Sequence, residues 1–431
     1  MAVVEKPENE SFYKKTINSW ALYHWAENGF GTAVMVAVLP VYYSKVAASG
    51  LTPNQATVYW GYTTTIALIL VAILAPILGT IANLIGIRKR LLMIFAAIGV
   101  VSSASFYFVK TGDWLLASAI FIVGNIAFAL ADVFHDSFLP HISKESDIDR
   151  VSSRGFAAGY LGGGIILIIS IAIIQLMSDK GLAARLTFIT SAIWWAVFTI
   201  PLILNVREPG NTGTLKGNAI LVSLKELSKT FHNVKHYRQL SLFLLAFLIY
   251  NDGIYTIFKM ATIYGAELGL NQNTLIGSLL LALIVGFPSA IFFGWLAKSI
   301  GAKKCIYICL LGYSLISIGG FFISKPIDFW ILGAAVGVVM GGAQALSRSY
   351  FGSMVPKSKT AEFFGFYGMS SRIGGFLGPL VFALVGQLMG NSRYAIISLL
   401  IFFIVGIILL INVDEKEGIK IAKQEDMQTS N

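Results

Sequence analysis

The sequence predicts an all-α integral membrane protein with twelve transmembrane helices in two pseudo-symmetric six-helix bundles. Hydrophobic residues make up 56% of the chain and charged residues only 13%, a composition that excludes a soluble domain. Apolar runs of about 20 residues, the length that crosses a hydrocarbon core of about 30 Å, recur along the chain. Their centres lie near Val36, Leu70, Ala97, Val123, Leu167, Val197, Leu248, Ala282, Leu311, Gly337, Gly374 and Phe402.

The longest polar interruption separates six apolar runs from six. We therefore expect an N-terminal bundle over residues 1–206, a cytoplasmic linker over 207–238, a C-terminal bundle over 239–413 and a cytoplasmic tail over 414–431. The polar stretch 1–18 contains no cleavage-site pattern, which favours a retained first helix over a removed signal peptide.

The basic residues indicate the orientation in the membrane. Most of the 32 Lys and Arg residues fall in every second polar segment, such as those with Arg90, Arg150 and Lys303. Because basic residues concentrate on the cytoplasmic side, this pattern places both termini in the cytoplasm, with the bacterial inner membrane as the expected location. It also accounts for the net charge of +10 without a nucleic-acid partner.

Polar breaks interrupt the first and seventh apolar runs at matching places. Asn28-Gly29-x-x-Thr32 aligns with Asp252-Gly253-x-x-Thr256, and Glu27 precedes the first of these motifs. A carboxylate at bilayer depth costs about 2.5–3.5 kcal/mol on insertion scales and persists only where it faces protein or a wet cavity. Such paired breaks indicate a central binding site of a transporter. The predicted substrate- or proton-binding residues are Glu27, Asn28, Asn251, Asp252, Lys259 and Arg372.

Each of these residues also has a structural interpretation. Asp252 is the first candidate for a protonatable group, but it could instead form an ion pair with Lys259, seven residues on and on the same helical face. His24, one turn before Glu27, either shares a proton with it or bonds a backbone carbonyl. Arg372 suits capture of a carboxylate, or it pairs with a buried acid such as Asp252.

A second cluster lies near the inner end of the fourth run. Asp132, His135 and Asp136 share one helical face, so they could ligate a divalent metal or form salt bridges at an inner gate with Arg154. We favour the gate and expect no bound metal. Arg348 and Glu362 complete the expected gate near the inner surface, where Glu362 suits a helix N-terminus. Cys305 and Cys309 are interpreted as buried thiols and not as metal ligands.

The two halves also repeat in the loops after the second and eighth runs. The segment Gly79 to Arg90 matches Gly294 to Lys304, with Gly86 over Gly301 and a pair of basic residues following each. This loop resembles the signature of the major facilitator superfamily, in which an Asp helps to latch the inner gate. Asn83 and Lys298 stand at that position in the two halves, and Arg88 is the first base of the signature.

Four further segments resemble the "unknown major facilitator" family, which includes the fungal vacuolar effluxer of amino acids released by autophagy. They run from Trp20 to Asn28, Asp136 to Gly163, Tyr250 to Glu267 and Gly341 to Tyr367. The position after Tyr23, often Asp in that family, is His24 here. The resemblance implies the major facilitator fold, a monomer, and export of amino acids.

We therefore expect a secondary active transporter of a small polar solute, most simply an amino acid or related zwitterion, coupled to protons or another ion. One alternative is a divalent-metal exporter, with either Asp132, His135 and Asp136 or His24 and Glu27 as metal ligands. The others are a lipid flippase and a non-transporting receptor. The sequence contains no phosphate-binding Gly-Lys-Ser/Thr loop and no His-Glu-x-x-His motif, so neither an enzyme nor a cofactor is expected. Membrane lipids are the other expected partners.

Overall fold

The computed structural model describes residues 10–143, 148–208, 237–356, 363, 367 and 375–430 of the 431-residue chain. Regular structure in these residues is helical throughout. Ten of the described helices are long and apolar enough to cross a membrane, and shorter apolar helices cover Gln272–Gly286 and Leu377–Met389. The predicted all-α membrane fold is confirmed, and ten of the twelve predicted runs are centred within these ten helices.

Contacts divide the chain into two compact units. The first contains Met1–Leu51 and Ile66–Leu227, and the second contains Thr52–Thr65 and Ser228–Asn431. The predicted linker 207–238 lies almost entirely outside the described residues.

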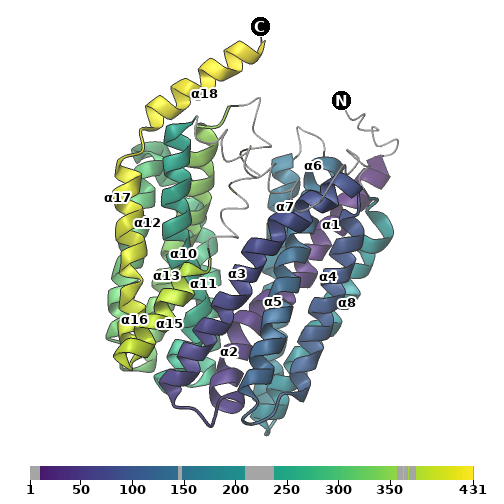
Figure 1. Cartoon of the computed structure of the whole chain (residues 1–431), viewed down its shortest axis with the longest axis vertical. Coiled ribbons are helices and arrows are strands. Elements are labelled where there is room, and N and C mark those ends of the chain that lie inside the picture. Colours follow the sequence, from purple (N-terminus) through teal and green to yellow (C-terminus); the bar gives the residue numbers. More distant parts are fainter. Residues whose placement is uncertain are drawn as a thin grey trace. The chain divides into compact units, whose positions relative to one another are not determined.

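The first unit is formed by the helices coloured purple to teal in Figure 1. Its described elements are α1 (Glu10–Asn28), η1 (Gly29–Val38), α2 (Leu39–Tyr42), η2 (Tyr43–Ala47), α3 (Pro53–Ile85, whose first part belongs to the second unit), α4 (Arg88–Ser105), η3 (Phe106–Phe108), α5 (Trp114–Ser137), α6 (Leu139–Ile142), α7 (Ile148–Leu176) and α8 (Lys180–Asn205).

The first span changes its helical type at the predicted polar break. It is α-helical to Asn28 and continues as a π-helix, η1, from Gly29. π-Helical turns are rare and are frequently found at functional sites. The break that the sequence marks by polar residues is therefore also a break in backbone geometry.

The second unit is formed by the green and yellow helices of Figure 1. Its described elements are α10 (Arg238–Glu267), α11 (Gln272–Ile300), α12 (Ala302–Phe321), α13 (Pro326–Ser353), α15 (Leu377–Met389), α16 (Ser392–Ser398), α17 (Leu400–Ile411) and α18 (Glu415–Ser430). The predicted tail thus forms a helix. Gln239 ties its start to α10, since Gln239 Oε1 accepts a hydrogen bond of 2.8 Å from the Asp414 amide and its Nε2 donates to Glu417.

The two signature loops share a glycine with a positive φ and a hydrogen bond to the end of the preceding helix. Gly86 and Gly301 both adopt a positive φ, of 73° and 89°. The amide of each donates a 2.9 Å hydrogen bond to the carbonyl four residues earlier, that of Ala82 and Ala297 respectively. A left-handed glycine at this place ends a helix without steric cost, which explains why the loop carries glycine in both halves.

Small residues allow α7 to lie against α1. A Cβ placed on Gly162 would lie 2.8 Å from Trp25 Cα and would also strike the Trp25 carbonyl oxygen. Both are backbone atoms, so no side chain can move to make room. Small residues at such contacts are the usual means of close helix packing in membranes.

We predict that Gly162→Ala lowers the stability of the purified protein by about 1–3 kcal/mol, the usual cost of overpacking. The cause is that α1 and α7 must separate. The measurement is the apparent Tm in detergent.

Gly164→Ala is the matched control, because no atom lies within 4 Å of its added Cβ. It should melt at or slightly above the temperature of the unaltered protein. Equal losses in both variants would contradict the proposed backbone contact.

Candidate functional site

The predicted carboxylates of the first and seventh runs are both buried. Glu27 and Asp252 are each 1% exposed. Glu27 lies in the last turn of α1, just before the π-helix, and Asp252 lies in the middle of α10. A buried carboxylate needs hydrogen-bond or charge partners within the protein.

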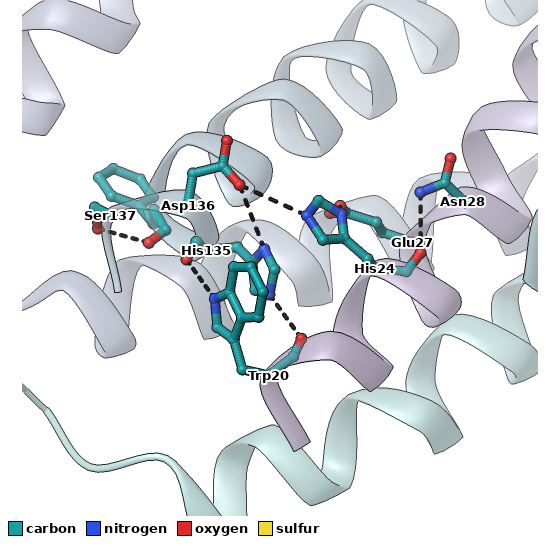
Figure 2. Close-up of polar contacts among 8 residues, drawn as sticks. Trp20, His24, Glu27, Asn28, His135, Asp136 and Ser137 are labelled. Carbon is teal, nitrogen blue, oxygen red and sulfur yellow. Dashed lines mark hydrogen bonds and ion pairs between the residues drawn. The ribbon is translucent and has the colours of Figure 1, made fainter. Parts of the chain in front are cut away.

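Glu27 belongs to a cluster that joins α1 to α5 (Figure 2). Its Oε1 lies 2.9 Å from His24 Nδ1, one turn earlier on α1. His24 Nε2 lies 3.6 Å from Asp136 Oδ1, and the same carboxylate oxygen lies 3.8 Å from His135 Nδ1. His24 is 6% exposed and His135 fully buried, whereas the Asp136 side chain is 38% exposed.

Trp20 contacts His135 through two hydrogen bonds and through ring stacking. Trp20 Nε1 donates a 2.9 Å hydrogen bond to the His135 carbonyl oxygen, and His135 Nε2 lies 2.8 Å from the Trp20 carbonyl oxygen. The two rings are also stacked, with centroids 4.6 Å apart. Since a carbonyl oxygen only accepts, His135 Nε2 carries a hydrogen.

The structure unites groups that the sequence predicted separately. One ligand atom from each of His24, Glu27, Asp132 and His135 lies within 4.8 Å of all the others. The sequence placed Glu27 in the substrate- or proton-binding site, with His24 as its possible proton partner, and it placed Asp132 and His135 at an inner gate or metal site. In the structure they form one polar cluster inside the first unit.

Asn28 uses its side chain within α1. Its Nδ2 donates a 2.9 Å hydrogen bond to the His24 carbonyl oxygen. A Cβ on Gly159 of α7 would lie 2.7 Å from the same nitrogen, so α7 closely covers this turn. Asn28 thus stabilises the end of α1 where the π-helix begins.

Asp252 holds the beginning of another helix. Its Oδ2 and Oδ1 each accept a 3.0 Å hydrogen bond, from the backbone amides of Leu377 and Gly378 respectively. These are the first two residues of α15, whose amides have no partner within the helix. Asp252 therefore caps α15 from a neighbouring helix, and its charge suits the positive end of the helix dipole.

Three other polar residues lie near Asp252 on α10. Asn251 is buried, and Thr256 donates a 2.7 Å hydrogen bond to the Asp252 carbonyl oxygen. Lys259 is half-buried, with Nζ 5.9 Å from the centroid of the Tyr255 ring.

The remaining predicted gate residues are placed as follows. Arg88 is buried and its guanidinium contacts the His141 ring. Burial and the Arg88 charge together lower the pKa of His141. The side chains of Arg154 and Arg348 are exposed. Asn83 lies on α3 and Lys298 on α11, and Glu362 and Arg372 lie outside the described residues.

An apolar pocket in the second unit lies apart from the predicted residues. It is lined from α10, α11, α12 and α13 by side chains such as Ile257, Leu279, Ile316 and Val336. Such a lining offers no ion pair or metal ligand to a polar solute, so this pocket is not the candidate site.

The polar cluster, the capped helix and the repeated loops lie in a chain that matches a known family. Residues 49–423 match the family described as "Vacuole effluxer Atg22 like". The chain belongs to this family. The resemblance predicted from the sequence segments is thus confirmed, and the chain is a membrane transporter and not an enzyme.

Individual relatives agree with this assignment. The chain is 38% identical to the MFS-type transporter YxiO of Bacillus subtilis (strain 168), over 96% of this chain and 98% of YxiO. It is 24% identical to the autophagy-related protein 22-1 of Neosartorya fischeri, over 86% of this chain and 77% of that protein.

Solved structures support the fold. A D-xylose-proton symporter superposes with a TM-score of 0.68 at 14% identity, covering 94% of this chain and 99% of the symporter. The nucleoside transporter NupG superposes with a TM-score of 0.64 at 12% identity, covering 92% of this chain and 97% of NupG. At such low identity these similarities concern the fold alone.

We predict that Asp252→Ala destabilises the protein by about 1.5–3 kcal/mol, because two helix-end amides lose a charged acceptor. Asp252→Asn keeps one acceptor oxygen and should lose less. The apparent Tm of the three proteins in detergent measures the difference. An alanine variant as stable as the unaltered protein would show that the α15 amides do not depend on Asp252.

Proposed function

We propose that this MFS-type transporter exports amino acids or related zwitterions by alternating access, driven by protons. The family description names vacuole effluxers, which supports export. The amino-acid class rests on the family resemblance of the sequence segments. We further propose that the protein is a monomer in the bacterial inner membrane with both termini in the cytoplasm, as the basic residues indicate.

The observation that carries this proposal is the contact between Asp252 and the start of α15. The ionised carboxylate accepts hydrogen bonds from the Leu377 and Gly378 amides. A proton on this group removes its charge and turns one carboxylate oxygen into a hydroxyl, which is a weaker acceptor for an amide N–H. Protonation therefore weakens the attachment of α15 to α10. This gives the proton a direct mechanical effect on the second unit.

The substrate class is supported by the charges that the sequence places in the membrane. A zwitterion offers a carboxylate and an ammonium group, so it needs a fixed cation and a fixed anion. Arg372, which the sequence places in the eleventh apolar run, is the proposed carboxylate partner. Asp252 is the proposed ammonium partner when it is ionised.

We predict that Asp252→Asn abolishes amino-acid accumulation driven by a pH gradient, while exchange of amino acids across the membrane at equal pH continues. The reason is that the amide cannot take up and release the coupled proton. The measurement is uptake of labelled amino acid into proteoliposomes under both conditions.

Asp414→Asn is the matched control. Asp414 is exposed, and its Oδ1 accepts hydrogen bonds from the Lys416 and Glu417 amides at the start of α18. It is thus also a helix cap, but one outside the membrane-spanning helices, and its loss should leave pH-driven accumulation unchanged. Unchanged pH-driven accumulation in Asp252→Asn would refute coupling through Asp252.

We also predict that an amino acid raises the apparent Tm of the purified protein and that Arg372→Ala removes this effect selectively for solutes with a carboxylate. A ligand at a hundredfold excess over its dissociation constant stabilises the folded state by about 2.7 kcal/mol. The measurement is a thermal-shift screen against amino acids, organic acids, sugars and amines. A response to sugars alone, or equal losses for all solutes, would contradict the proposed substrate class.

A further inference from the structure

We propose that His24, Glu27, Asp132 and His135 form a binding site for a divalent transition-metal ion inside the first unit. Their ligand atoms already lie within 4.8 Å of one another without an ion. The site shares no residue with Asp252 and Arg372, the proposed proton and solute partners, because its four residues belong to α1 and α5.

The spacing of the four residues suits an ion held between two helices. Each helix contributes a pair three residues apart, His24 with Glu27 on α1 and Asp132 with His135 on α5. Residues at this spacing share a helical face. Carboxylate and imidazole pairs at this spacing on facing helices build the metal sites of several helix bundles.

His135 presents an unprotonated nitrogen to the cluster. Its Nε2 carries the hydrogen, because that nitrogen lies 2.8 Å from the Trp20 carbonyl oxygen. In the neutral ring Nδ1 then keeps its lone pair. A histidine whose other nitrogen donates to a carbonyl is the usual arrangement of a metal ligand, since that bond fixes the tautomer and the ring orientation.

Two acceptor atoms of the cluster are buried without a hydrogen-bond donor. Glu27 Oε2 and His135 Nδ1 make no hydrogen bond, although Glu27 is only 1% exposed and His135 fully buried. Asp136 Oδ1 lies 3.8 Å from His135 Nδ1. It is a carboxylate oxygen and so offers this nitrogen no hydrogen. Burial of unmatched acceptors is costly, and a bound cation satisfies both at once.

The donor set determines which ions fit. Two imidazole nitrogens and two carboxylate oxygens suit Zn²⁺, Co²⁺, Fe²⁺ or Mn²⁺, whereas Ca²⁺ and Mg²⁺ prefer oxygen ligands alone. Asp136 adds a partner outside the ligand set. It lies 3.6 Å from His24 Nε2, so it can accept from that nitrogen while His24 Nδ1 binds the ion.

Binding of Co²⁺ and Zn²⁺ to the purified full-length chain tests the site. We expect the unaltered protein, freed of its affinity tag and treated with chelator, to bind one Co²⁺ with visible absorption bands that Zn²⁺ removes. Glu27→Gln and Asp132→Asn preserve side-chain shape and should each weaken Co²⁺ binding at least about tenfold. His135→Ala should abolish the bands.

His141→Ala is the control, because His141 lies on α6 against Arg88 and outside the four ligands. It should bind Co²⁺ as the unaltered protein does. Absence of Co²⁺ binding in the unaltered protein, or equal affinity in the Glu27→Gln and Asp132→Asn variants, would overturn the proposal. Because the readout is metal binding, its failure leaves the amino-acid flux measurements untouched, and their failure leaves this result untouched.

Discussion

The constraint on which the rest of this structure depends is the need of every polar group at bilayer depth for a partner within the protein. Glu27 and Asp252 show two solutions to it. Glu27 meets an imidazole on its own helix and a group of polar side chains on α5. Asp252 instead binds the free amides at the start of α15. In both cases the carboxylate joins separate helices, so the same groups that need burial also organise the packing around them.

Close packing of α1 against α5 and α7 brings the polar side chains of the first unit into contact. Glycines on α7 bring this helix against α1, where a Cβ on Gly155 would lie 2.9 Å from the His24 ring. The stacking of Trp20 on His135 packs α5 against α1. Glycine contacts with α7 and the Trp20–His135 contact, which includes two hydrogen bonds, thus lie beside the polar cluster. Its geometry depends on the packing of the whole first unit and not only on the four polar residues.

The sequence predicted the fold well because its signals are local. Apolar runs mark the helices, and the pair Gly86 and Gly301 marks the loops where a positive φ is required. The buried carboxylates were also predictable, since charge at bilayer depth is rare. The joining of His24 and Glu27 to Asp132 and His135 was not, because helical periodicity does not fix how two helices are rotated against each other. The partners of Asp252 were equally hidden, since backbone amides have no sequence signature.

The change to a π-helix at Gly29 is a structural difference between two halves that have similar sequence motifs. Asn28-Gly29-x-x-Thr32 and Asp252-Gly253-x-x-Thr256 align residue for residue, yet α10 stays α-helical through its motif whereas the first span does not. Bends in long helices concentrate where the regular hydrogen-bond ladder is interrupted, as it is in π-helical turns. The first span can therefore bend more easily beside Glu27 than α10 can bend beside Asp252. Equivalent positions in the two halves would then flex unequally during a transport cycle.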